Sequence, residues 1–268
     1  MRGKHKESDL PAATMALISA ANDAPEIGRR ALPAYVLGQE NQSMPLISDE
    51  EILETQHDDG GWTNVPETVL LSVICRLRPT LHDCYLAALS WLRNVRGSDG
   101  GWGMSERDIS RIPTTGLLLY LLPELSDQKA VDWLKNEWRK DFQGDTRLTY
   151  KGAFFLLGLS ASGVSIDDCS LIKETYSFLF DEQNDDGGFG PWKDHPIGSD
   201  PWSTGIGLLG LLSYPELVKR EVIEKAVNWL AKNQLPNGLW PYHYIEEGSA
   251  YAYWGLVEAL KYLSKESI

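Results

Sequence analysis

Three acidic side chains stand at or just before apolar runs that we expect to form helices. They are Glu67, Asp145 and Asp200. A carboxyl group in a dry, apolar setting keeps its proton to higher pH and can act as a general acid. An acid at a helix start can instead cap the helix and interact with its dipole. Both interpretations stay open, and we rank Asp200 before Glu67 and Asp145 because Trp192 and Trp202 flank it.

Basic side chains near the same helix starts indicate where an anion would bind. Lys151 lies in an otherwise apolar predicted helix, and Arg147 precedes it. A buried lysine needs a partner, so Lys151 either pairs with an acid such as Asp145 or Glu67 or meets an anionic ligand such as a diphosphate. His195, in a long loop, is either a general acid or base or an ordinary surface residue.

Aromatic side chains are concentrated near Asp200 and near the end of the chain. Trp192 and Trp202 flank Asp200, while Tyr242 and Tyr253 belong to the densest aromatic stretch. Such rings either pack as core or line an apolar cavity, where their faces would suit isoprenoid chains and carbocations. We predict these four side chains as walls of a binding site.

A repeat organises the whole chain. Four segments run from Gln or Arg through a glycine turn to an aromatic residue, and we call them the Gln–Trp loops: 56–62, 96–102, 183–189 and 234–240. Aromatic-Leu pairs in the preceding helical patterns recur every 42 to 51 residues. A repeat of this length with helical patterning is typical of stacked helix pairs. We predict a structural role for the loop residues Gln56, Gln183, Gln234, Trp62, Trp102 and Trp240.

A second signature alternates with the first and opens nearly all-apolar helices, which are buried on every side. The other helices have a polar face and are expected to lie outside them. Inner helices are predicted near 9–20, 64–78, 110–122, 146–162, 199–213 and 249–264, and outer helices near 25–39, 79–96, 126–142, 166–184 and 216–234, with a short one near 48–56. Six such pairs predict a closed ring, because an open solenoid would expose the apolar inner helices.

Charge and composition exclude several classes of function. The chain has 25 Lys and Arg against 38 Asp and Glu, a net charge of −13, so most of its surface repels nucleic-acid phosphates and anionic lipids. No apolar stretch approaches the roughly 20 residues that span a bilayer, and no signal peptide is visible. The three cysteines lack metal-site spacing and are typical of reduced thiols. We expect a cytoplasmic protein with no membrane span and no nucleic-acid partner.

The four Gln–Trp loops and the segment 199–205 resemble the family of squalene–hopene cyclases, class II terpene cyclases and protein prenyltransferase β subunits. The resemblance covers residues 8–264 and implies an (α/α)6 barrel, here a single one. It also implies an isoprenoid or lipid-like substrate. Prenyltransferases bind zinc through Asp, Cys and His, but Asp83-Cys84-Tyr85 matches that pattern only in part. We therefore expect neither a metal nor a cofactor.

Class II cyclases protonate an alkene with an Asp from a DxDDT motif that opens an inner helix. This sequence has no DxDD. Aligned on Thr204, Asp200 matches the first Asp of the motif, whereas Trp202 and Ser203 replace the other two, including the proton donor. Glu67 stands one residue before Thr68 at the corresponding place.

The sequence thus predicts one all-α barrel over 9–264 with tails at 1–8 and 265–268. Its predicted function is an acid-initiated, terpene-cyclase-like reaction in an aromatic-lined cavity. The first alternative is a non-catalytic barrel that binds a prenyl chain, a lipid or a protein partner. A carbohydrate-active (α/α)6 enzyme is a further alternative, which paired carboxylates across an aromatic cleft would suit. The oligomeric state is left open.

Overall fold

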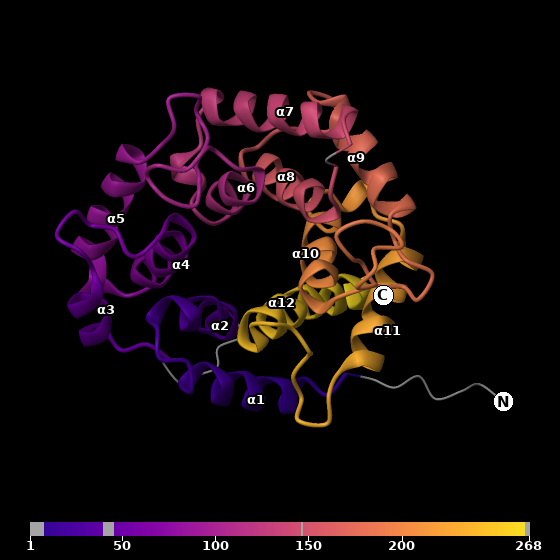
Figure 1. Ribbon diagram of the computed structural model, residues 1–268, viewed down its shortest axis with the longest axis horizontal. Coiled ribbons are helices and arrows are strands. Elements are labelled where there is room, and N and C mark those ends of the chain that lie inside the picture. Colours follow the sequence, from indigo (N-terminus) through magenta and orange to yellow (C-terminus); the bar gives the residue numbers. More distant parts are fainter. Residues whose placement is uncertain (1–7, 40–45, 146, 266–268) are drawn as a thin grey trace. The chain divides into compact units, whose positions relative to one another are not determined.

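The computed structural model describes residues 8–39, 46–145 and 147–265. Within these ranges the chain forms α-helices and short 3-10 turns, and no strand. The α-helices are α1 (Leu10–Asn22), α2 (Ile27–Gln39), α3 (Asp49–Thr55), α4 (Val65–Arg76), α5 (His82–Asn94), α6 (Ile112–Leu121), α7 (Gln128–Gln143), α8 (Thr149–Ala161), α9 (Ser170–Asp181), α10 (Pro201–Leu211), α11 (Arg220–Asn233) and α12 (Ile245–Lys265) (Figure 1). Each helix predicted from the sequence is present. The predicted tails lie outside the described residues except for Ser8 and Lys265.

The described chain divides into two compact units, and each is described by itself. Unit 1 comprises residues 1–20, 147–156 and 166–268, and unit 2 comprises 21–146 and 157–165. The sequence predicts a single domain over 9–264, and that stays a prediction. Helix α8 contributes its first half to unit 1 and its second half to unit 2.

Unit 2 consists of two rows of helices. In the inner row α2 packs on α4 and α4 packs on α6, while α5 covers α4 and α7 covers α6 (Figure 1). The inner helices α4 and α6 bury nearly every residue, as their apolar sequences predict. The outer helix α7 has one apolar face, on which Trp133, Leu134 and Trp138 are buried.

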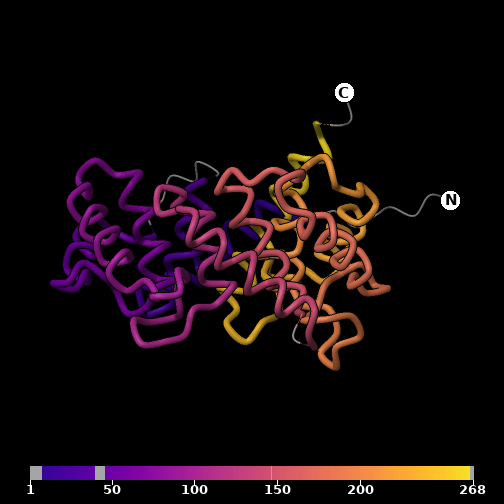
Figure 2. The backbone as a smooth tube through the Cα atoms, turned by 90° about the horizontal axis from the view of Figure 1, so that it is seen from above, coloured from indigo at the N-terminus to yellow at the C-terminus, as the bar shows by residue number. Residues whose placement is uncertain are grey.

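Unit 1 repeats this arrangement with the start of α8, α10 and α12 in the inner row. Figure 2 follows its backbone through α9 to α11 in orange and α12 in yellow. Helices α10 and α12 approach so closely that a Cβ at Gly205 would overlap the backbone of Tyr251, and a Cβ at Gly255 would overlap Gly205. Glycine at positions 205 and 255 is therefore a packing requirement, which allows the two helix backbones to touch.

The first two helices occupy rows opposite to those predicted. The sequence predicts an inner helix at 9–20 and an outer helix at 25–39, but α2 packs on α4 in the inner row of unit 2. In unit 1, α1 holds the position of an outer helix next to the fourth Gln–Trp loop. Gln234 of that loop binds the backbone of Asp9, just before α1, as the glutamines of other loops bind their neighbouring outer helices. The second signature predicts a buried helix here, yet Met15 of α1 is 67% exposed.

Each Gln–Trp loop links its own turn to the next outer helix. The amide of Gln56 donates to the carbonyls of Gly60 and Cys84, at 2.8 and 2.9 Å. Gln183 and Gln234 make the equivalent pairs of bonds. The first glycine of each turn has a positive φ, a conformation that other residues adopt only with strain. These glycines are Gly60, Gly100, Gly187 and Gly238. These contacts support the structural role predicted for the loops.

The loop aromatics are tied to the inner helices by a recurring hydroxyl. The backbone N–H of Trp102 donates to Oγ1 of Thr115 at 2.8 Å, and that of Phe189 donates to Oγ1 of Thr204 at 3.0 Å. The same bond joins Trp62 to Thr68 and Trp240 to Ser249. The hydroxyl near each inner-helix start therefore joins two elements of the repeat.

Arg96 replaces Gln in the second loop, and its charged guanidinium links the loop turn to the start of the next outer helix as the glutamine amides do. Its Nε donates to the carbonyl of Gly100 at 2.8 Å, and its guanidinium binds both oxygens of Asp127 at 2.7 Å. The guanidinium also lies over the ring of Trp102, 4.7 Å from its centroid. The bond from Arg96 lowers the pKa of Asp127 to about 2.

Arg96→Ala is expected to lower the free energy of unfolding by about 1–2 kcal/mol, because it removes a hydrogen bond and a partly exposed bidentate pair. In the wild type the pair stabilises the fold above the unfolded pKa of Asp127, about 4, and this contribution is lost as the pH falls towards 2. Urea unfolding from pH 6 to pH 2.5 should show a shallower loss of stability in the variant. Arg96→Gln, which restores the amide of the other loops, should lose less. Equal slopes for wild type and Arg96→Ala would contradict this account.

Candidate functional site

Asp200 caps the inner helix α10. Its Oδ1 accepts from the backbone N–H of Ser203, and its Oδ2 accepts from the Ser203 hydroxyl, both at 2.7 Å. Burial raises the pKa of Asp200, while the two bonds from Ser203 and the nearby His195 oppose that rise. Asp200 therefore combines the two roles that the sequence left open, a cap and a partly buried acid.

Trp202 is the centre of an aromatic cluster at the start of α10. Its ring centroid lies 5.4 Å from that of Tyr150, 5.6 Å from Tyr251 and 6.2 Å from Phe154. Residues four apart share one helix face, which explains why Tyr150 and Phe154 of α8 reach the same ring. The close approach of α10 and α12 brings Tyr251 against Trp202 from the other side.

Glu247, in the first turn of α12, joins this cluster and was missed by the sequence analysis. Its Oε1 accepts from the indole N–H of Trp202 at 3.2 Å. Burial raises the pKa of Glu247, and the Trp202 bond and the charge of His243 oppose the rise, whereas Glu246 adds to it. We call Tyr150, Phe154, Trp202, Glu247 and Tyr251 the Trp202 cluster.

A sequence signal for Glu247 existed in the repeat. Ser249 takes the place of the threonine that binds the loop aromatic in the other repeats, and Glu247 stands two residues before it, as Trp202 stands two before Thr204. Glu247 also precedes Tyr251 by four residues and so shares its helix face. Because this repeat has serine instead of threonine, the correspondence between Glu247 and Trp202 is hard to recognise from the sequence.

Tyr242 packs against the start of α12, near Glu247. Its ring packs on the backbone of Gly248 in the first turn of α12. Burial raises the pKa of Tyr242, and the negative charges of Asp200 and Glu247 raise it further. The phenol therefore stays protonated, and it lies within the electrostatic reach of both carboxyl groups.

The other acids predicted from the sequence lie elsewhere. Glu67 is half-buried in unit 2, where it packs against Gly28 of α2, and burial raises its pKa. It accepts a hydrogen bond from Thr63 at 3.4 Å. Asp145 is exposed in the turn directly after α7.

The remaining predicted binding residues are dispersed within unit 1. Trp192 is 43% exposed and meets the ring of His195 edge-on at 4.1 Å. The hydroxyl of Tyr253 lies 3.1 Å from that of Thr14 on α1. Lys151 is half-buried in the first turn of α8, and Arg147 is exposed with its guanidinium over Phe178. Among the predicted aromatic walls, the structure places Trp202 and Tyr242 beside the acids.

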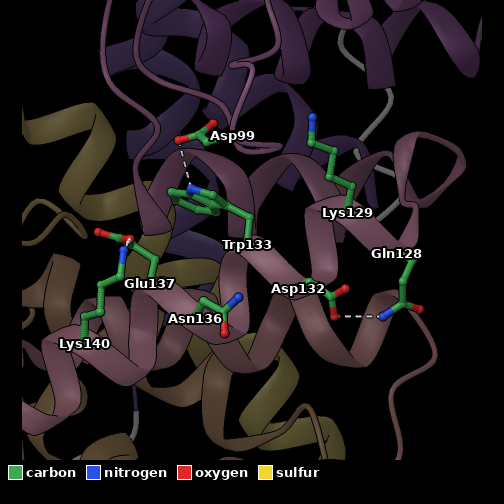
Figure 3. A pocket seen from close by; sticks show the side chains of 8 residues that line it. All are labelled: Asp99, Gln128, Lys129, Asp132, Trp133, Asn136, Glu137 and Lys140. Carbon is green, nitrogen blue, oxygen red and sulfur yellow. Dashed lines mark hydrogen bonds and ion pairs between the residues drawn. The ribbon is translucent and has the colours of Figure 1, made fainter.

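A surface groove in unit 2 offers a contrast to this site. Figure 3 shows side chains of α7 along it, together with Asp99. Its polar groups bind one another: Trp133 donates to Asp99, Gln128 to Asp132, and Lys140 to Glu137. Asp99 holds the Trp133 indole as Asp186 holds that of Trp229 in another repeat. The groove thus follows from the packing of the repeat.

Two further findings concern metals and membranes. Among the described residues, no group of three or more His, Cys, Asp or Glu side chains is placed to hold a metal ion. Within the same residues, no helix has the length and apolar character needed to cross a membrane.

Three curated relatives match the chain, and no protein-family model does. A squalene–hopene cyclase from Zymomonas mobilis is 25% identical over 272 residues, covering 77% of this chain and 41% of that protein. A protostadienol synthase A from Arthroderma gypseum and a lanosterol synthase from Candida albicans are 31% and 32% identical over 101 and 111 residues, covering 34% and 37% of this chain and 14% of each relative. The chain therefore spans less than half the length of these relatives.

Solved structures match nearly the whole chain. The type II terpene cyclase MstE from Scytonema, without ligand, has a TM-score of 0.71 at 16% identity, covering 94% of this chain and 97% of that one. A protein from Actinoplanes has a TM-score of 0.72 at 15% identity, covering 94% and 100%. A variant of MstE in complex with its substrate geranylgeranyl dihydroxybenzoate has a TM-score of 0.63 at 15% identity, covering 94% and 87%.

These likenesses confirm the predicted fold class, the all-α barrel of alternating inner and outer helices. Curated sequence relatives and solved structures point to the same group of proteins independently. The Gln–Trp loops, with their shared contacts, are the feature of this sequence that resembles that group. The chain is thus similar in sequence to a squalene–hopene cyclase over 77% of its length, and in fold to a type II terpene cyclase over 94%.

Proposed function

We propose that the protein is a terpene-cyclase-like enzyme that protonates an isoprenoid or polyene and guides the resulting carbocation. The observation that carries the proposal is the Trp202 cluster, in which the carboxyl group of Glu247 binds the Trp202 indole among aromatic rings, while Asp200 caps the helix that carries Trp202. Burial raises the pKa of both acids, and an acid that keeps its proton is what alkene protonation requires. The ring faces would stabilise a cation formed next to them.

The chemistry is redox-neutral and needs no cofactor. The acid transfers its proton to one carbon of an alkene, and the π electrons form the new C–H bond. The neighbouring carbon becomes a cation, which the next double bond attacks to close a ring. Loss of a C–H proton to water ends the sequence, and the carboxylate regains a proton from solvent. The aromatic-lined cavity that would hold the chain is part of the proposal.

The proposal is tested by product analysis in heavy water. Purified protein is incubated with geranylgeranyl diphosphate, farnesyl diphosphate, squalene and geranylgeranyl dihydroxybenzoate, each in separate reactions. We expect a cyclised product with one of them that carries one deuterium at the carbon where the reaction begins. A product without deuterium would contradict acid initiation.

The alternative of a non-catalytic barrel rests on the missing DxDD motif. It predicts that none of the four compounds is converted. It also predicts that a prenyl chain or lipid can be extracted from the purified protein and identified by mass spectrometry. That pair of results would replace the enzyme with a carrier.

A further inference from the structure

Three carboxyl groups lie at the starts of α10 and α12, and their surroundings differ. Asp200 precedes α10, while Glu246 and Glu247 fall in the first turn of α12. Glu246 is 2% exposed, but the Trp202 indole binds its neighbour, Glu247. The comparison for a proton donor is therefore between Asp200 and Glu247.

Asp200 is engaged on both oxygens. Each accepts a bond of 2.7 Å from Ser203, one from the backbone N–H and one from the hydroxyl. Hydrogen bonds to a carboxylate favour its charged form. Proton transfer from Asp200 would moreover have to occur at an oxygen that already serves the helix cap. These contacts suit a residue that holds the start of α10, and with it Trp202, in place.

Glu247 accepts fewer hydrogen bonds than Asp200 and lies next to aromatic rings. Among the described residues, its carboxylate accepts a single hydrogen bond, from the Trp202 indole at 3.2 Å, and this engages Oε1. Oε2 is left to carry a proton. The rings that surround this group, Trp202 and Tyr251, stand 5.6 Å apart between their centroids. A cation formed beside Glu247 would thus face aromatic π systems at once.

We infer that Glu247 is the catalytic proton donor and that Asp200 is a positioning residue which fixes Trp202 at the start of α10. The inference rests on the proposed function and names the acid that performs its first step. In that step the Oε2–H bond of Glu247 breaks and its electron pair stays on the carboxylate. The substrate is a polyene whose terminal trisubstituted alkene accepts the proton and leaves a tertiary cation against the Trp202 cluster.

The inference is tested by comparing Glu247→Gln with Asp200→Asn. The glutamine keeps the shape and can still accept from Trp202, but it has no acidic proton. We expect Glu247→Gln to lose at least about 100-fold in turnover, the usual scale for a general acid. The asparagine of Asp200→Asn can still accept from the Ser203 N–H and donate to its hydroxyl, so we expect turnover within about tenfold of the wild type. Glu221→Gln, in the first turn of α11, is the matched control and should keep full turnover.

A measurement on the folded wild type tests the same assignment without turnover. Infrared difference spectra between pH 4 and pH 7 report the C=O stretch of protonated carboxyl groups. Asp200 and Glu67 also have raised pKa values and contribute to the same region. We therefore expect the band above the ordinary range of glutamate, about 4.3, to lose one component in Glu247→Gln relative to the wild type, and Asp200→Asn to keep that component. The groups that act on this titration are His243, Glu246, Tyr242, Tyr251 and the Trp202 indole.

The outcomes separate the two proposals. Turnover by the wild type that survives in Glu247→Gln and is lost in Asp200→Asn would overturn the inference and leave the cyclase function standing. No product from any substrate with the wild type would overturn the cyclase function and the inference with it. If Glu247→Gln fails to fold, the absence of the band from the wild type would still refute the assignment.

Discussion

Gly205→Ala is expected to destabilise the protein by about 3 kcal/mol or more, because the added methyl group has no space. A Cβ at this position would overlap the carbonyl of Tyr251 and lie 2.8 Å from the backbone nitrogen of Ala252. Both neighbours are backbone atoms of α12, so relief requires the two helices to separate. That movement would also disturb Gly255, which packs against Gly205 from α12.

Urea unfolding followed by circular dichroism measures this effect, with Gly207→Ala as the control. Gly207 lies on the same helix, and a Cβ there would meet the side chain of Phe189 at 3.1 Å. A ring can shift slightly, and alanine is the better helix former, so we expect Gly207→Ala within about 1 kcal/mol of the wild type. Equal stability of the two variants would refute the close approach of α10 and α12.

Trp202→Ala is expected to cost about 3 kcal/mol of stability, at the lower end for a large aromatic because the side chain is half-buried. The change removes contacts with Tyr150, Phe154 and Tyr251 and the hydrogen bond to Glu247. It should also abolish any cyclisation, since it removes the ring at the centre of the Trp202 cluster.

Two variants separate these effects. Trp192→Ala alters an exposed ring and should change stability by less than about 0.5 kcal/mol, as surface substitutions usually do. Trp202→Phe keeps a ring but loses the indole N–H. Because that N–H favours the charged form of Glu247, its loss should raise the pKa of Glu247, which the infrared titration would detect. An unchanged titration of Glu247 in Trp202→Phe would mean that the hydrogen bond from the indole has no effect on the pKa of Glu247.

The acid-and-ring arrangement also bears on the missing motif. In the family motif the acids follow one another at the start of one inner helix, whereas here the acids nearest the rings come from α10 and α12. Under the proposed function, Glu247 of α12 supplies the acid that the segment before Thr204 lacks. This view makes the lack of DxDD compatible with acid chemistry at the Trp202 cluster.

Sequence patterns alone determined the helices, the alternation of inner and outer helices after α2, and the fold class. The Gln–Trp loops can be recognised from local sequence, because a glycine turn, an amide and an aromatic residue must occur at a fixed spacing for the loop to close. The apolar inner helices are equally visible, since burial on all sides leaves no polar face. Helix α12 shows the limit: residues 245–248, outside the predicted range 249–264, form its first turn and carry Glu247.

Only the tertiary structure decided the row of each early helix and the acids that meet aromatic rings. The second signature predicts α1 in the inner row, but its row is set by the bond from Gln234 to the backbone of Asp9, 225 positions away. Trp202 and Glu247 are 45 positions apart and meet because two glycines let α10 and α12 touch. Asp145 and Asp200 look alike in sequence, yet one is exposed and the other partly buried. The pKa of a carboxyl group depends on such packing, since burial and neighbouring charge are properties of the folded chain.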